Sequence, residues 1–233
     1  TSWKSIRGLW KKSRKRTTGI RLPHGKLDAG SIRQFLQEQS AKSEGLPSVY
    51  QRLFSLEPLR DRRFFTVNRK ILELIRSAEK DWSQGELISG VLVDGSPGMG
   101  RTSLLNVCQL EIIAEHVVRL DDSLIARRRG VLSALGQELG VSGSGQAILN
   151  SLRRRKTVIL IDNLDYWMRH DPDGLAEMRE LFQIMVTSMG CAFWVATIKT
   201  VNLEIFERLF SVSSAFSHRA HLKRLNDKDI QRL

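Results

Sequence analysis

The chain has 233 residues, with 37 Lys or Arg against 25 Asp or Glu, so its formal net charge is +12. Two cysteines form no disulfide framework and show no zinc-ligand spacing, and no apolar run approaches the ~20 residues of a transmembrane helix. A disulfide-rich module, a zinc module and a spanning segment within this chain are therefore excluded. The cysteine usage favours a reducing compartment, so we expect a cytoplasmic protein, with a peripheral place on a membrane or on DNA as the alternative.

Basic residues are concentrated near the N-terminus, where the run 11–16 lies inside an acid-free stretch from Lys4 to Arg21. Such charge density attracts polyanions, which makes nucleic acid the first predicted partner. Four apolar residues share one helical face beside this run: Trp3, Ile6, Leu9 and Trp10. That arrangement is typical of helices that bind anionic membrane surfaces, the second predicted partner. A solvated basic tail is the alternative to both.

The next segment, 29–44, has helical spacing through Ile32, Phe35 and Leu36, and residues 46–54 form a compact apolar patch. Packing over the edge of a sheet and docking on a neighbouring subunit are the two interpretations. We assign residues 1–62 to a helical, basic N-terminal extension and residues 63–233 to an α/β core. The core opens on the segment 64–69, which precedes apolar residues at helical spacing from Ile71 to Ile75.

The most informative segment is a glycine-rich loop that follows the apolar run Val91–Asp94 and precedes a helix-forming segment, Thr102 to about His116. It matches the phosphate-loop pattern G-x-x-x-x-G-K-S/T, with Arg101 in place of lysine. Backbone N–H groups and the helix N-terminus would face phosphate, and Thr102 would offer its hydroxyl to Mg²⁺. A plain glycine turn is the alternative. The predicted ligand-binding residues of the loop are Gly95, Ser96, Pro97, Gly98, Met99, Gly100, Arg101, Thr102 and Ser103.

Strand and helix patterns alternate through the rest of the chain. The predicted strands after the first are Val117–Leu120, Val158–Asp162, Ala192–Thr197 and Ala220–Lys223. Helical spacing joins the apolar residues between Leu124 and Leu139 and those between Leu175 and Met185. Alternation of this kind predicts parallel strands joined by right-handed crossovers. We therefore expect an α/β three-layer sandwich around a central, mostly parallel, five-stranded sheet.

These segments together resemble the core of an AAA+ superfamily ATPase of the additional-strand class, in the branch with origin-recognition, transposition and STAND-like switch ATPases. Residues 64–69 resemble the F-V-x-R opening that lies against the adenine, so Asn68 and Arg69 are expected to border that base. The strand that ends at Asp162 resembles the Walker B strand, whose Asp binds the metal. Helix capping is the alternative role of Asp162. The family's helical lid is not expected within this chain.

The resemblance also assigns catalytic positions. Asn163 stands where the family has a water-polarising Glu, and Asp165 is the nearest substitute carboxylate. Thr197 is expected to sense the γ-phosphate, with Lys199 as second choice and a plain strand end as the alternative. Arg219 is expected to be the arginine finger that completes a neighbouring subunit's site, with Arg208 in reserve.

The sequence therefore predicts an ATP-binding switch in which Mg²⁺-ATP lies between the subunits of a homo-oligomer and controls assembly or partner engagement. Thr102 and Asp162 would hold Mg²⁺. Hydrolysis is expected to be slow because Arg101 and Asn163 depart from the family pattern, so enzyme activity is left open. The alternative is a pseudo-ATPase scaffold that binds nucleic acid or anionic membrane through its basic N-terminus. A DNA-remodelling ATPase would need Asp165 as its base.

Overall fold

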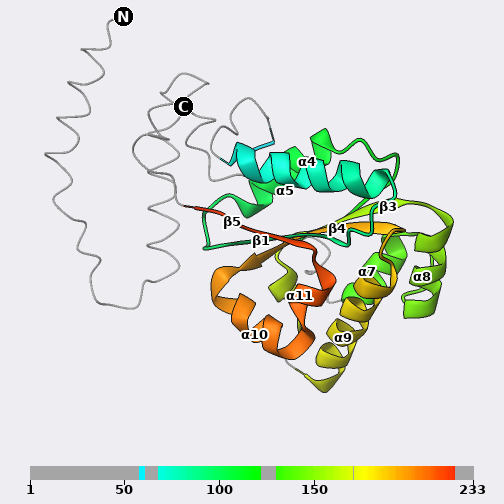
Figure 1. The fold of residues 1–233 in the computed structure, drawn as a ribbon. Helices are drawn as coiled ribbons and strands as arrows, with labels where there is room; N and C mark the ends of the chain where they lie inside the picture. Colours follow the sequence, from blue (N-terminus) through cyan, green and yellow to red (C-terminus); the bar gives the residue numbers. More distant parts are fainter. Residues whose placement is uncertain (1–57, 61–67, 122–129, 170, 224–233) are drawn as a thin grey trace, which may run out of the picture. The chain divides into compact units, whose positions relative to one another are not determined.

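A five-stranded, fully parallel sheet forms the centre of the computed structural model, which describes residues 58–60, 68–121, 130–169 and 171–223 (Figure 1). The strand order is β2-β3-β4-β1-β5. The strands are β1 (Gly90–Gly95), β2 (Val117–Leu120), β3 (Thr157–Ile161), β4 (Ala192–Lys199) and β5 (His218–His221). The predicted α/β class and five-stranded sheet are confirmed. Most of the predicted N-terminal extension, including the basic run, lies outside the described residues.

Helices cover both faces of the sheet, as the predicted three-layer sandwich requires (Figure 1). On one face lie α4 (Arg69–Ser83) and α5 (Arg101–Glu111). On the other lie α7 (Val131–Glu138), α9 (Pro172–Thr187), α10 (Thr200–Phe210) and α11 (Val212–Ala215), with α8 (Gly145–Arg154) packed against α7 and α9. A short 3₁₀ turn, η2 (Leu164–Trp167), follows β3. None of the described helices is long and apolar enough to cross a membrane.

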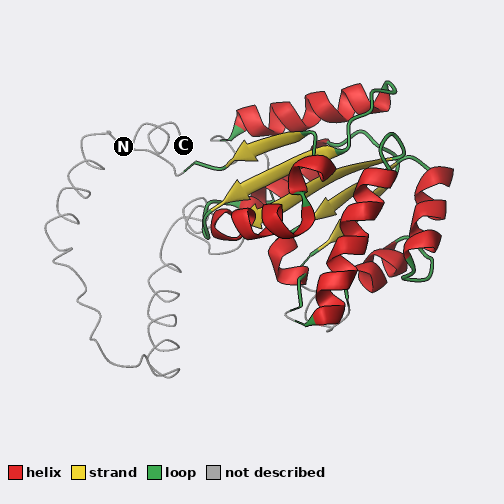
Figure 2. Cartoon of the chain, turned by 60° about the horizontal axis from the view of Figure 1, so that its bottom comes forward, coloured by secondary structure: helices red, strands yellow, loops and turns green. Residues whose placement is uncertain are grey.

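The order of the strands determines where a crevice opens. Right-handed crossovers change face when the chain reverses its direction along the sheet. The helix after β1, α5, lies on one face, whereas α9 and α10, after β3 and β4, lie on the other (Figure 1). Figure 2 shows the helices on both sides of the strands. Ligands of open α/β sheets bind at the carboxyl ends of strands, beside such a reversal. In this chain that place is the end of β1 and β4.

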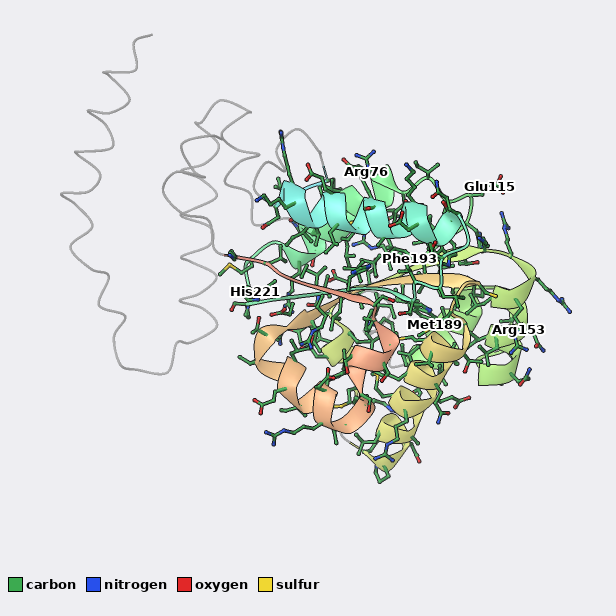
Figure 3. All side chains as sticks on the ribbon, viewed as in Figure 1. Arg76, Glu115, Arg153, Met189, Phe193 and His221 are labelled. Atoms are coloured by element: carbon green, nitrogen blue, oxygen red, sulfur yellow. The ribbon has the colours of Figure 1, made fainter. Side chains whose placement is uncertain are left out.

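The central strands are buried on both faces, which explains their continuous apolar sequences. Side chains alternate between two cores. Val93, Leu160 and Phe193 face α4 and α5, and Phe193 lies 5.8 Å from the Trp82 ring of α4 (Figure 3). Leu92, Ile161 and Ala196 face the other helices. The same alternation places Asp162 and Thr197 on the side of α5.

Three local differences from the sequence prediction have physical reasons. The helix after the loop ends at Glu111 rather than near His116, because the chain turns extended at Ile112. The last strand is His218–His221, two residues earlier than predicted, because its register follows β1. Helix α8, which sequence reasoning did not identify, begins where the hydroxyl of Ser144 accepts a hydrogen bond from the Ala147 N–H at 3.4 Å. Of the helical spacing predicted between Leu124 and Leu139, residues 122–129 lie outside the described residues.

A buried carboxylate, Glu79, closes the end of α5. Its Oε1 accepts hydrogen bonds from the N–H groups of Ile113 and Ala114, each at 3.2 Å. Burial raises the pKa of Glu79 above its ordinary value, and the two N–H donors and Arg76 oppose that rise. The charged form therefore costs stability above the folded-state pKa, and this cost disappears as the pH falls through it.

We expect Glu79→Gln to be more stable than the wild type at pH 8, because the amide oxygen still accepts both N–H bonds and carries no charge. The gain in melting temperature should be about 2 °C. It should vanish near pH 4, where both proteins are neutral at this position. Glu73→Gln, an exposed change on the same helix, is the matched control and should show no such trend. A Glu79→Gln variant that melts below the wild type at pH 8 would contradict this account.

Candidate functional site

The glycine loop connects the buried end of β1 to the first turn of α5, the strand–loop–helix setting that the sequence predicts. Gly98 and Gly100 have φ values of +80° and +84°, a left-handed conformation that favours glycine. The Met99 N–H donates to the Ser96 carbonyl at 3.2 Å and closes the turn. A Cβ added at Gly98 would meet nothing within 4 Å, so the glycine serves the backbone conformation rather than tight packing. The predicted loop residues from Ser96 to Gly98, Pro97 included, are exposed.

Arg101 is buried at the start of α5, with 8% of its surface exposed. Its Nη1 has no hydrogen-bond partner among the described residues. A Cβ built on Gly95 would lie 3.5 Å from the Arg101 Cγ, so the arginine stem lies beside the last residue of β1. A buried, unpaired guanidinium nitrogen costs stability, and such groups call for an explanation. A phosphate group that reaches this nitrogen would pair it, so Arg101 is a residue that fits a bound phosphate.

Asp162 and Thr197 join the ends of β3 and β4. The Thr197 hydroxyl donates to Asp162 Oδ1 at 2.8 Å and accepts from the Asn163 N–H at 2.9 Å. Both side chains are buried. The second carboxylate oxygen of Asp162 makes no hydrogen bond to a described residue, which leaves it for a metal. The single proton of Thr197 is already used by Asp162, so this arrangement gives Thr197 a positioning role and leaves it no donor for a phosphate.

Asp165, the predicted substitute base, is bound on both oxygens. Its Oδ2 accepts from Asn202 Nδ2 at 2.7 Å and lies 3.9 Å from Lys199 Nζ. Its Oδ1 accepts from the Lys199 N–H at 3.4 Å. Only 1% of its side chain is exposed. In this arrangement Asp165 holds the start of α10 and does not face water as a general base would. The neighbouring Asn163 lies in the left-handed region at φ 50°, which asparagine tolerates.

A second polar cluster, which sequence reasoning missed, lies at the end of β1 on the side of the sheet opposite α5. Asp94 Oδ2 accepts from the Thr200 hydroxyl at 2.8 Å and lies 2.7 Å from His221 Nδ1. The cluster ties β1 to the start of α10 and to the end of β5, where His221 is drawn (Figure 3). The signal in the sequence was an acidic residue at the end of a strand that is otherwise apolar. Because Asp94 alternates with Val93 and Gly95, its side chain faces away from α5.

The remaining loop-side candidates have local roles. The Ser103 hydroxyl accepts from the Leu59 N–H at 3.0 Å, and Asn106 Nδ2 donates to the Leu59 carbonyl at 2.9 Å, so residues 58–60 dock on α5. Thr102 is half-buried. Asn68 precedes α4, where its carbonyl accepts from the Ile71 N–H, and Arg69 is exposed. Contact of Asn68 and Arg69 with an adenine stays a prediction.

The predicted trans-acting arginines lie on the surface. Arg219 is within β5, not before it, and its Nη1 lies 3.8 Å from Glu207 Oε2. Arg208 forms an exposed ion pair with Glu204 one turn earlier on α10. No contact between described residues joins either arginine to the loop of its own chain. Both positions are compatible with action on a second copy, which stays a prediction.

Metal ligands are sparse at this site. No group of three or more His, Cys, Asp or Glu that could hold a metal occurs among the described residues. Mg²⁺ does not need one, since it binds through one or two protein oxygens together with phosphate oxygens and water. Thr102 and Asp162 can supply those oxygens, so the predicted metal pair fits this chemistry.

Comparison with known proteins identifies the fold. No protein-family model and no curated protein matches the sequence. The structure is similar to the Orc1 protein of Aeropyrum pernix, solved in complex with DNA, with a TM-score of 0.54 and 16% identity over 72% of this chain and 48% of that one. It is also similar to the Walker-type ATPase Paby2304 of Pyrococcus abyssi, with a TM-score of 0.53 and 13% identity over 76% of this chain and 59% of that one.

The chain thus matches about half of one of these proteins and three-fifths of the other. At such identities the likeness concerns the fold. The parallel sheet of order 2-3-4-1-5, with an additional strand between β1 and β3, is that of P-loop NTPases.

We expect Thr197→Val to destabilise the protein, because the change leaves a buried carboxylate oxygen and the buried Asn163 N–H without their partner. The loss in free energy of unfolding should be about 2 kcal/mol, measured by urea denaturation. Thr187→Val, an exposed change at the end of α9, is the control and should cost less than about 0.5 kcal/mol. Equal stability of the two variants would remove Thr197 from its positioning role.

Proposed function

We propose that this chain is an ATP-binding switch module that holds Mg²⁺-ATP at the glycine loop and turns it over slowly. The observation that carries the proposal is the buried Arg101 side chain, whose Nη1 is unpaired among the described residues and which directly follows a loop with two left-handed glycines. Natural sequences tolerate such a cost mainly where a ligand removes it. The position at the end of β1 in a P-loop NTPase fold supports the same ligand class.

The residues have distinct tasks in this proposal. Arg101 and the loop N–H groups bind the β- and γ-phosphates, and the positive end of α5 adds favourable potential. Thr102 and the unpaired oxygen of Asp162 hold Mg²⁺, with Thr197 fixing the Asp162 carboxylate. Bound Mg²⁺ supplies neutralisation of phosphate charge. Asn68 and Arg69 border the adenine.

Slow ATP turnover is expected because neither Asn163 nor Asp165 is suited to accept a proton from water. The Asn163 amide cannot take a proton from water, and Asp165 is buried with both oxygens bound. Arg101 presents a planar fork instead of a compact ammonium. These features suit a protein in which bound ATP, rather than ATP hydrolysis, acts as the signal. In this proposal nucleotide binding controls the assembly of a homo-oligomer, with Arg219 or Arg208 completing a neighbouring site.

The second candidate is a pseudo-ATPase scaffold, favoured by the engaged state of Asp165 and Thr197. Its working part would be the basic N-terminal run, which binds nucleic acid or an anionic membrane surface. The similarity to an Orc1 protein solved with DNA supports nucleic acid as the partner. Deletion of residues 1–21 separates the two surfaces, because it should abolish polyanion binding and leave nucleotide binding intact. Unchanged polyanion binding would exclude the N-terminal run as the partner site.

The proposal predicts opposite effects of Arg101→Met on stability and on ligand response. Without nucleotide, the variant should melt above the wild type by about 2–4 °C, because an unpaired buried charge is replaced by an apolar side chain of similar length. With saturating Mg²⁺-ATP, the wild type should gain stability and the variant should not. Thermal denaturation with and without nucleotide measures both.

Arg179→Met, an exposed change on α9, is the control and should keep the full response to Mg²⁺-ATP. Arg101→Lys should also keep it, since lysine is the usual residue of the motif. An Arg101→Met protein that responds like the wild type would place the ligand elsewhere. A wild type without any response would leave the scaffold as the function.

A further inference from the structure

The backbone of Lys199, the last residue of β4, lies beside the glycine loop. In the sheet its Cα is paired with that of Gly95, the first loop residue. Neighbouring strands lie about 4.8 Å apart, so the lysine stem leaves the backbone next to the phosphate-binding turn. It alternates with Ile198 and shares a side of the sheet with Thr197, the side covered by α5. A four-carbon stem gives its ammonium a wide reach over this edge.

The Lys199 ammonium makes no hydrogen bond to a described residue. Lys199 Nζ lies 3.9 Å from Asp165 Oδ2 and 4.0 Å from the centre of the Tyr166 ring, and 21% of the side chain is exposed. A separation of 3.9 Å is too long for a hydrogen bond. The attraction is therefore electrostatic, from a carboxylate and from a half-exposed aromatic ring. The N–H donors of the ammonium are free to bind a stronger acceptor.

Other side-chain donors near the loop already have a partner or a role. The Thr197 hydroxyl donates its proton to Asp162, and Arg101 is buried at the start of α5. The loop itself lacks the compact ammonium that its sequence pattern normally carries at position 101. Among the described residues in strand register with the loop, Lys199 is the lysine that can fill this role.

We propose that Lys199 supplies the phosphate-binding ammonium that the loop lacks, and that Asp165 and Tyr166 hold it in reserve until a nucleoside triphosphate competes for it. This inference rests on the proposed function. A terminal phosphate carries more charge than one carboxylate, so a triphosphate draws Lys199 away from η2, whereas a diphosphate does not. Movement of the Lys199 ammonium to the phosphate uncovers the Tyr166 ring, so the surface of the ATP-bound protein differs from that of the free protein.

A double-mutant cycle on the full chain tests the proposal. Mg²⁺-ATP and Mg²⁺-ADP affinities are measured by calorimetry for Lys199→Met, Asp165→Asn and the double variant. Lys199→Met should weaken ATP binding about tenfold, the value of one charged hydrogen bond, and change ADP binding less than about twofold. Asp165→Asn keeps the Asn202 bond through its one amide oxygen, gives up the weak bond from the Lys199 N–H and releases the ammonium, so ATP binding should tighten about threefold or more. That gain should be absent in the double variant.

Lys80→Met, an exposed change on α4, is the matched control because it removes the same charge. Equal ATP affinities of Lys199→Met and Lys80→Met would overturn the proposal while leaving ATP binding through Arg101 intact. Absence of nucleotide binding by the wild type would overturn both. If Asp165→Asn does not fold, Tyr166→Leu weakens the same restraint at an exposed position and should also tighten ATP binding. Unchanged ATP affinity there would exclude the restraint.

Discussion

The alternation of side chains along three buried parallel strands is the constraint on which the rest of the structure depends. Because β1, β3 and β4 are apolar on both faces, polar groups are confined to their ends, where hydrogen bonds can satisfy them. Because side chains alternate along each strand, the position of a polar residue decides which face of the sheet it lies on. Asp162 and Thr197 turn toward α5 and the glycine loop, while Asp94 turns toward α10. The site is therefore a product of register: a shift of one residue in β4 would move Thr197 to the opposite core.

In the proposed function, the site combines features that favour nucleotide binding with features that oppose nucleotide turnover. Arg101, at the start of α5, and Lys199, on the strand next to β1, would bring positive charge to the loop. Asp162 keeps one carboxylate oxygen without a hydrogen bond to any described residue, as the proposed metal ligand needs. In the same proposal, the amide Asn163 stands at the position of the proton acceptor, and the nearest carboxylate, Asp165, supports α10. Affinity and chemistry are separable properties in such a site, since binding needs complementary charge and hydrolysis needs in addition a positioned base.

The sequence alone predicted the sheet well, because fully buried strands have continuous apolar runs that end at polar residues. Prediction of β5 was less accurate: only four residues long and at the edge of the sheet, it alternates between half-buried and exposed side chains and carries little apolar signal. The glycine loop and Asp162 could be found from motif and context. The Asp94 cluster and the pairing of Asp165 with Asn202 could not, because their partners lie 106 and 37 positions away and only the folded chain brings them together. The sequence shows that the loop carries an arginine, but it does not show that the Arg101 side chain is buried or that its Nη1 has no partner among the described residues.

The contact between Gly95 and Leu222, the residue after β5, has a mechanical consequence. A Cβ at Gly95 would come within 3.0 Å of the Leu222 Cβ, and the Leu222 N–H donates to the Asp94 carbonyl at 2.8 Å. Together with His221 on the Asp94 carboxylate, these contacts fasten the base of the loop to the strand beside it. A displacement of the loop base would therefore have to break these contacts or be shared by β5. That strand lies at the edge of the sheet and, within the described structure, pairs only with β1, so the contacts with the loop base add to a single strand pairing.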